Sequence, residues 1–212
     1  DAAVSAAANW KAGVKPDFTL GLDSAIFSES GDTANVDVPL WLQGLTLRRP
    51  AGGVFTFAAG GGNLILGNGG ITADEARADA ARCYTNDVPT TIGDTQTWLL
   101  PSENSVVVQN GARAGSENAT LLVTGNGDLH LKADNSAFSG TMDFSVSDDA
   151  SCSGVVAHVW HPHALGGPDG ITRVGAKYVT SLGKRTAKLV FHGTNEIDRA
   201  LDFYGDDSTR FA

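Results

Sequence analysis

The chain has 212 residues, of which 42% are hydrophobic and only 18% are charged. Its 15 basic and 24 acidic residues give a formal charge of −9. This balance argues against a nucleic-acid partner, because phosphate contacts need clustered Lys and Arg side chains. No stretch is long and apolar enough to cross a bilayer, so we expect no membrane span.

The first ten residues contain neither a basic n-region nor a continuous apolar core, so they are not an intact signal peptide. The length suits one large domain with a core of its own. We therefore treat residues 1–212 as a single domain and expect it to be a segment of a longer exported protein.

Short stretches in which apolar and polar residues alternate recur along the chain, separated by turns rich in Gly, Asn and Asp. Within each stretch, alternate residues point to the same face. This predicts strands with one buried and one solvated face. The stretches are residues 36–38, 45–47, 54–57, 64–66, 129–131 and 142–144.

One segment, residues 72–84, predicts a helix. Thr72 is placed to cap it, Glu75 follows three residues later, and alanines fill its interior. We interpret this helix as a short surface excursion between strands. A specificity-determining insertion is the alternative.

Strands of three to five residues with frequent turns favour a solenoid, in which short strands stack in parallel and no coil buries its apolar face alone. With roughly 20 to 25 residues per coil, the chain would form about nine coils. The fold we predict is therefore an all-β parallel β-helix. A β-sandwich is the alternative, because short alternating strands occur in both folds.

The segment 125–146 resembles the repeat of autotransporter-associated β-helix repeat proteins. That motif has Gly-Xaa-Gly, a Leu-Xaa-Leu strand, then Asn-Xaa-Tyr-Ser-Gly-Thr and a closing hydrophobic strand. The matching residues are Gly125, Gly127, Leu129, Leu131, Asn135, Phe138, Ser139, Gly140, Thr141 and Val146. Phe138 stands where the family usually has tyrosine.

Looser matches extend the resemblance from about Trp10 to Gly205, whereas residues 72–89 and 147–168 depart from the pattern. The resemblance implies a right-handed, single-stranded parallel β-helix like those of autotransporter passenger domains. It also implies a bacterial protein that is secreted or displayed on the cell surface.

Three of the five histidines, His158, His161 and His163, lie within six residues. On an extended strand His158 and Trp160 would face one way and His161 the other, unless Pro162 turns the chain.

His161 and His163 could approach a single zinc or copper ion. A third ligand has no fixed spacing in the sequence, and its candidates are Asp148, Asp149 and Asp169. We favour a solvated loop, and expect no metal and no cofactor.

Aromatic side chains beside polar groups can stack on a sugar ring. The candidate ligand-binding residues are Trp160, Tyr84 and Tyr178, together with His158, His161 and His163. The alternative for Trp160 is a place in the core or under a loop. We interpret Trp10, Trp41 and Trp98 as structural, with Trp10 covering the open end of the stack.

The two cysteines, Cys83 and Cys152, have no metal-ligand spacing. An exported protein could join them in a disulfide, and two buried thiols are the alternative.

We identify no catalytic residue. The acidic pairs Asp148–Asp149 and Asp206–Asp207 are adjacent residues, so the members of a pair on a strand would face opposite ways. The sequence also lacks a Gly-Xaa-Ser-Xaa-Gly nucleophile elbow and a phosphate-binding glycine pattern.

Our first functional hypothesis is a structural or interaction module, a stalk, display or adhesion segment whose partner is a surface protein or a polysaccharide. The second is a carbohydrate-binding module attached to a glycan-degrading enzyme. The third, a polysaccharide lyase or hydrolase on the same scaffold, requires carboxylates that converge on one lateral groove.

Overall fold

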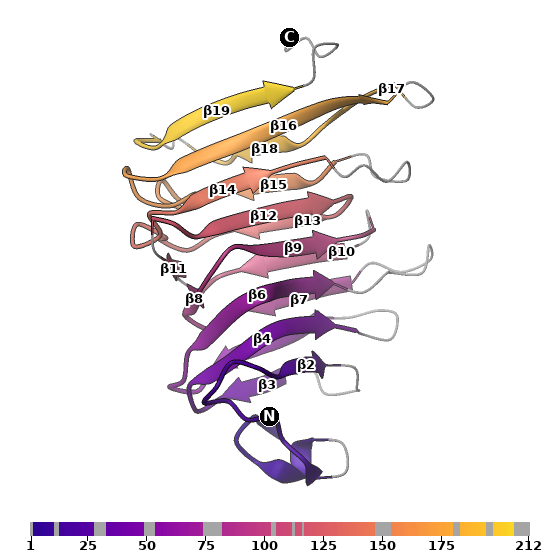
Figure 1. The fold of residues 1–212 in the computed structure, drawn as a ribbon, viewed down its shortest axis with the longest axis vertical. Coiled ribbons are helices and arrows are strands. Elements are labelled where there is room, and N and C mark those ends of the chain that lie inside the picture. The colour runs from indigo at the N-terminus through magenta and orange to yellow at the C-terminus, as the bar shows by residue number, and fades with distance from the viewer. Residues whose placement is uncertain are drawn as a thin grey trace.

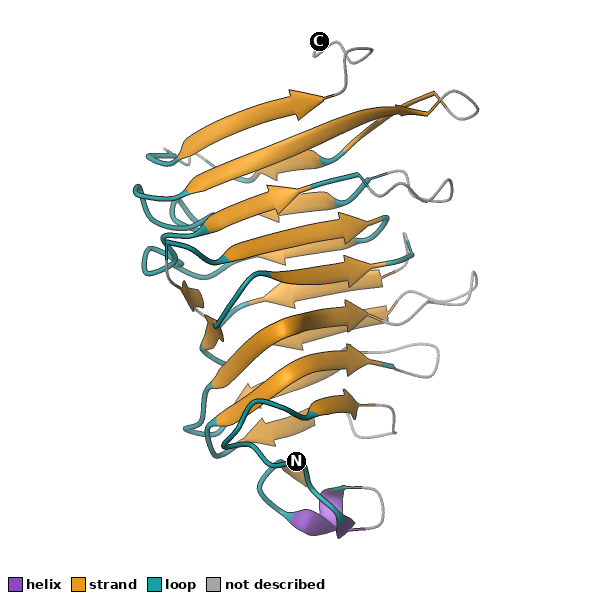
Figure 2. Cartoon of the chain, in the orientation of Figure 1, coloured by secondary structure: helices purple, strands orange, loops and turns teal. Residues whose placement is uncertain are grey.

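The computed structural model describes residues 2–10, 13–27, 33–48, 54–73, 82–102, 105–111, 113–115, 117–146, 154–179, 183–193 and 197–205. Almost all regular structure in these ranges is β-strand (Figure 2). Helix is confined there to the N-terminal end, where η1 (Ala7–Asn9) forms one 3-10 turn.

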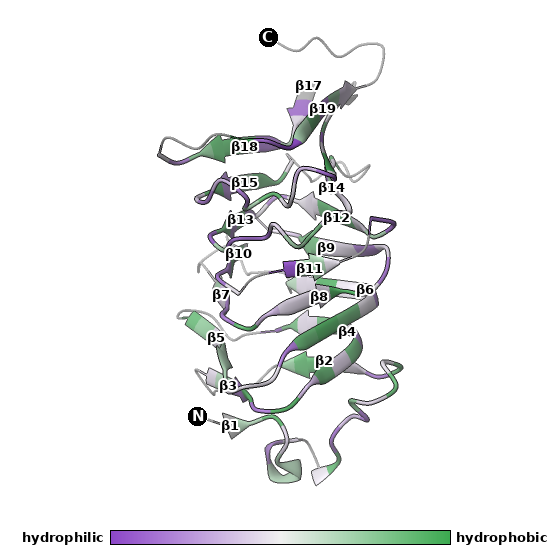
Figure 3. Ribbon diagram, turned by 90° about the vertical axis from the view of Figure 1, so that its left-hand side faces the viewer, coloured by the Kyte–Doolittle hydropathy of each residue, from purple (hydrophilic) through white to green (hydrophobic). Residues whose placement is uncertain are grey.

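The strands form two sheets, which we call sheet A and sheet B. Sheet A contains β1 (Ala2–Ala3), β3 (Thr33–Val36), β5 (Val54–Ala59), β7 (Arg82–Asn86), β10 (Ser105–Gln109), β13 (Asp128–Leu131), β15 (Val156–Val159) and β18 (Lys188–Phe191). Sheet B contains β2 (Ser24–Phe27), β4 (Leu40–Leu47), β6 (Leu64–Ala73), β8 (Thr90–Ile92), β9 (Gln96–Leu100), β11 (Arg113–Gly115), β12 (Thr120–Gly125), β14 (Thr141–Phe144), β16 (Ile171–Val179), β17 (Gly183–Thr186) and β19 (Ala200–Gly205). Figure 3 shows the sheets as two layers, with β8 and β11 between them on the side that faces the viewer.

The chain passes alternately through the two sheets and climbs one level with each coil. In Figure 1 the sheet B strands run to the right in front, and the sheet A strands run to the left behind them. Because the chain also rises from the N-terminus, the coil is right-handed. The described strand pairs are parallel, with one antiparallel pair between β16 and β17. The predicted parallel β-helix is therefore confirmed. The β-sandwich alternative is wrong, because sandwiches are built from antiparallel sheets.

The coils differ in length more than we expected from the sequence. Hydrogen bonds between neighbouring coils join residues 22, 23, 29 and 34 positions apart. The described part of sheet A has eight strands, where about nine coils were predicted. The longer turns on some coils account for the difference.

The core lies between the two sheets and is filled by alternate side chains of each strand. Leu129 and Leu131 of β13 are fully buried, as are Met142 and Phe144 of β14. Burying such a side chain contributes on the order of 1.5 to 3 kcal/mol relative to leaving it exposed. The alternation in the sequence therefore identified the buried faces of these strands.

The helix predicted over residues 72–84 is wrong at both ends. Thr72 belongs to β6, where it lies between Thr46 of β4 and Leu99 of β9 in parallel register. Tyr84 belongs to β7. Pairing with strands on both sides outweighs the local helix signal, and residues 74–81 lie outside the described residues.

Trp10 lies at the N-terminal end of the stack, as we predicted. Its indole N–H donates a hydrogen bond to the carbonyl oxygen of Val4 at 2.8 Å. The ring packs at 5.8 Å from the ring of Phe18 and at 5.5 Å from that of Phe27. These aromatic contacts cover the apolar face at the N-terminal end of the described coils.

The motif of segment 125–146 has a clear structural meaning. Gly125 has a φ of 119°, a backbone conformation that favours glycine. Asn135 is fully buried and joins successive coils through its side-chain amide. Phe138 is also fully buried, between the guanidinium groups of Arg113 at 5.8 Å and Arg199 at 5.6 Å. The turn after β13 is thereby held to the coils on both sides.

Candidate functional site

Four aromatic side chains gather on the outer face of sheet A, and we call them the histidine–tryptophan stack: His130, His158, Trp160 and His192. His130 and His158 are stacked, with ring centroids 4.4 Å apart and planes 14° apart. Trp160 and His192 are also parallel, at 3.6 Å and 3°. The predicted ligand-binding residues His158 and Trp160 thus belong to one cluster.

Strand register positions this stack. His130, His158 and Val190 occupy equivalent places on β13, β15 and β18, so the two imidazoles lie side by side. Trp160 and His192 each come two residues later, so they point to the same outer face. We did not single out His130 and His192 from the sequence. The sequence signal that could have identified His130 is its outward position between Leu129 and Leu131.

Polar contacts tie the stack together. Nδ1 of His158 lies 2.9 Å from Nε2 of His192, so one nitrogen donates and the other accepts. The indole N–H of Trp160 donates to Nδ1 of His130 at 3.3 Å. The Lys132 ammonium lies 5.7 Å from the Trp160 ring centroid. Burial lowers the pKa of His130, and the nearby His158 lowers it further.

Trp160 is 44% exposed, so it is not a core residue. One face of its ring is nevertheless covered. His192 stacks on the ring at 3.6 Å, while His130 and Lys132 approach it from the neighbouring coil.

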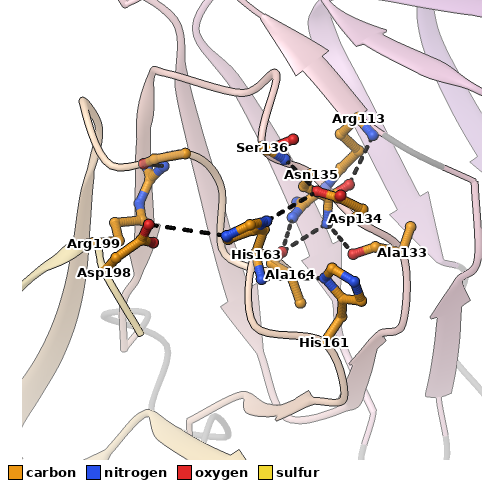
Figure 4. Close-up of polar contacts among 11 residues, drawn as sticks. Arg113, Ala133, Asp134, Asn135, Ser136, His161, His163, Ala164, Asp198 and Arg199 are labelled. Carbon is orange, nitrogen blue, oxygen red and sulfur yellow. Dashed lines mark hydrogen bonds and ion pairs between the residues drawn. The ribbon is translucent and has the colours of Figure 1, made fainter. Parts of the chain in front are cut away.

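A second cluster lies in the turns that follow β13 and β15. His161 and His163 face Asp134 of the preceding coil, and one ligand atom from each residue lies within 4.8 Å of the others (Figure 4). The carboxylate in this group of potential ligands is therefore Asp134. Asp169 does not belong to this group, and Asp148 and Asp149 lie outside the described residues.

A comparable group of potential metal ligands consists of Asp128, His130 and His158. In this group the two imidazoles lie in parallel planes, whereas the His161 and His163 rings are inclined at 64°. The lone pair of an imidazole nitrogen lies in the plane of its ring. Lone pairs of two stacked rings therefore lie in parallel planes and do not converge on one point. Inclined rings can direct their lone pairs to one point.

Tyr84 is not an exposed ligand-binding residue, because its side chain is 2% exposed and belongs to the core. The backbone of Tyr178 lies in β16, and its side chain lies outside what the structure describes. Cys83 is a half-buried residue of β7. Cys152 lies outside the described residues, so a disulfide between the two cysteines stays a prediction.

Charged side chains form a column on the outer face of sheet B. Asp143, Arg173 and Asp202 occupy equivalent places on β14, β16 and β19. Nε of Arg173 lies 3.4 Å from a carboxylate oxygen of Asp202. The Tyr204 hydroxyl donates to Asp143 at 2.7 Å, and burial together with this bond raises the Tyr204 pKa. Opposite charges therefore alternate from coil to coil.

An open hollow of about 690 Å³ lies beside the N-terminal segment. Phe18, Trp41 and Ile65 form part of its apolar lining, and Lys15 and Asp17 contribute polar groups. Trp41, which we interpreted as structural, has a side chain that is 42% exposed. Trp41 lies on the outer face of β4, next to Ile65 of β6.

No helix in the described ranges is long and apolar enough to cross a membrane. Comparisons of the chain with protein-family models, with curated proteins and with solved structures gave no match. The resemblance to autotransporter-associated repeats therefore stays a prediction that rests on the motif residues.

Proposed function

We propose that this chain is a structural and display segment of an exported bacterial protein, a rigid β-helical stalk that joins or presents other parts of that protein. The observation that carries the proposal is that the outward side chains of one coil contact those of other coils. On both sheets, outward aromatic and charged groups contact each other from coil to coil. They stabilise the stack along its length.

The core supports the same role. Inward side chains form one continuous cluster that extends from Val4 near the N-terminus to Ala187 near the last coils. Because each coil buries its apolar face against its neighbours, stiffness is a property of the whole stack. A rigid segment of this kind suits the spacing or presentation of domains to a surface partner.

The contacts around Trp160 weigh against a sugar platform there. Stacking on a sugar needs an open aromatic face. The Trp160 ring has His192 stacked on one face, its N–H donates to His130, and the Lys132 ammonium lies 5.7 Å from its centroid. The column of Asp143, Arg173 and Asp202 likewise holds its charges in contacts between coils, which weighs against a lyase or hydrolase.

The hollow beside Trp41 favours carbohydrate binding as the second candidate function. It combines an exposed indole with an apolar wall and the polar groups of Lys15 and Asp17. This is the combination of a flat apolar surface and polar edges that suits a sugar ring.

A glycan-binding screen tests these alternatives, with the intact chain beside the variants Trp160→Ala and Trp41→Ala. The display proposal predicts no binding by any of the three proteins, and no cleavage of the same polysaccharides. Binding that disappears in Trp41→Ala alone would replace it with the carbohydrate-binding function. Binding lost only in Trp160→Ala would contradict our interpretation of the covered indole.

A further inference from the structure

The turns after β13 and β15 bring together three side chains with metal-binding chemistry. Asp134 comes from the first turn, and His161 and His163 come from the second (Figure 4). The backbone holds the turns in place, because the Asn135 N–H donates to the carbonyl of His163 at 3.2 Å. The Asn135 amide also donates to the carbonyl of Ala164 at 2.7 Å. These hydrogen bonds fix the two turns relative to each other and so position the three side chains.

The distance between His163 and Asp134 suits a shared metal better than a direct hydrogen bond. Nδ1 of His163 lies 3.4 Å from Oδ1 of Asp134, beyond the usual N–H···O range. Two ligands of a tetrahedral zinc ion, each about 2.1 Å from the metal, would lie about 3.4 Å apart. Nδ1 of His163 is buried and has no hydrogen-bond partner, which is unusual for a buried polar atom.

Asp134 is an ionised and oriented carboxylate. Carboxylates are ionised at neutral pH, and the Ser136 backbone N–H donates to Oδ1 of Asp134, which fixes the direction of this carboxylate. The backbone bond measures 2.9 Å. A negative charge therefore faces the ring nitrogen of His163 at neutral pH.

Asp198 lies on the other side of the His163 ring. Its carboxylate is 3.9 Å from Nε2 of His163, while Nδ1 faces Asp134. A carboxylate near the second nitrogen of a ligating histidine orients the ring and strengthens the ligand. Asp198 is thus placed as a positioning residue.

His161 can supply the third ligand from Nδ1. This nitrogen accepts the backbone N–H of His163 at 3.1 Å, so it carries a lone pair. The two imidazole centroids lie 5.7 Å apart with planes inclined at 64°, so their lone pairs are not parallel. Binding would exchange one backbone hydrogen bond for a metal bond.

We propose that Asp134, His161 and His163 form a binding site for a zinc-type divalent transition metal, with Asp198 as the positioning carboxylate. Two imidazoles and one carboxylate are ligands that zinc accepts, and the half-exposed side chains of His163 and Asp134 leave a fourth position for solvent. The site clamps the turns that follow β13 and β15, and the Asp198 segment before β19 supports it. Bound metal therefore stabilises the stack.

Calorimetric titration of the untagged chain with zinc chloride tests the site, and cobalt(II) absorption reports its geometry. We expect one zinc ion per chain and the visible absorption of tetrahedral cobalt. His163→Ala should weaken binding at least 100-fold, and Asp198→Asn by about 10 to 100-fold. The matched control His130→Ala, in the histidine–tryptophan stack, should bind as the intact chain does. No zinc binding, or loss in His130→Ala with retention in His163→Ala, would overturn the proposal.

A second measurement does not depend on any variant folding. In NMR spectra of the intact chain, zinc should shift the imidazole signals of His161 and His163 and leave those of His130 and His158 unchanged. At 100 times its dissociation constant, zinc should raise the midpoint of thermal unfolding by roughly 5 to 10 °C. Shifts confined to His130 and His158 would place the metal elsewhere and contradict the site.

Discussion

The side chain of Asn135 accepts a hydrogen bond from the backbone N–H of Arg113 at 2.7 Å, although 22 residues separate them. The same side chain donates to the carbonyl of Ala164 on the following coil at 2.7 Å. One buried amide therefore links three successive coils. It satisfies the first backbone N–H of β11 and a carbonyl in the turn after β15.

Replacing Asn135 with alanine should lower the free energy of unfolding by about 2 to 4 kcal/mol, because buried backbone groups lose their partners. Urea unfolding followed by circular dichroism measures the change. Asn110→Ala is the matched control, since the Asn110 side chain donates to Asp87 at an exposed turn. The control should cost less than about 1 kcal/mol. Equal losses in the two variants would contradict the role of Asn135.

Leu129 and Leu131 are both fully buried on β13, so each should be needed for stability. Replacement of either by alanine should cost about 2 to 5 kcal/mol, since it removes apolar contacts and leaves a cavity. Chemical denaturation of the two variants tests this. Leu22→Ala provides the same chemical change at a side chain that is 70% exposed and should be nearly neutral. Near-neutral results at Leu129 and Leu131 would refute the inward direction of the strand.

Arg113 and Arg199 are both buried, and we expect their replacement to have opposite effects on the free energy of unfolding. Nε and Nη1 of Arg113 have no hydrogen-bond partner, and burial together with the Arg199 charge lowers the pKa of Arg113 to about 9. The Arg199 guanidinium instead donates to the Thr172 hydroxyl and to the carbonyls of Phe138, Gly140, Gly167 and Ile171.

Arg113→Met should leave the free energy of unfolding unchanged or raise it by up to about 4 kcal/mol, because a desolvated charge is replaced by an apolar side chain. Arg199→Met should lower it by about 2 to 5 kcal/mol, because several buried carbonyls lose their donor. Thermal and urea unfolding of the two variants provide the comparison. A similar loss of unfolding free energy in both variants would show that the buried charge of Arg113 is compensated as well as that of Arg199.

The lowered pKa of His130 predicts a loss of stability in mild acid. The unfolded chain protonates this imidazole near its ordinary pKa of 6.5, while the folded chain resists protonation until lower pH. The unfolded state therefore binds more protons in this window, so the free energy of unfolding falls as pH drops below about 6.5.

Urea unfolding at several pH values between 7.5 and 5 should show a smaller decline for His130→Gln than for the intact chain. NMR titration of the His130 imidazole gives the pKa directly and should place it below 6.5. An equal decline in both proteins, or a His130 pKa above 6.5, would rule out this explanation.

The sequence by itself determined the local features of the fold. Alternation over three or four residues identified the buried side chains of β13 and β14, because side-chain direction in a strand depends only on position. Glycine and Asn positions marked the turns for the same local reason. Tyr84 and Thr72 were misread because a local helix signal competed with strand pairing supplied by distant residues.

Only the tertiary structure decided which residues meet between coils. The interval between equivalent positions varies with turn length, so no fixed spacing in the sequence identifies Asp134 as the neighbour of His163 or His192 as the neighbour of Trp160. Register between parallel strands sets these contacts, and register arises from the packing of the whole stack. The sequence therefore determined the faces of the strands, and the stacking of the coils determined the candidate sites.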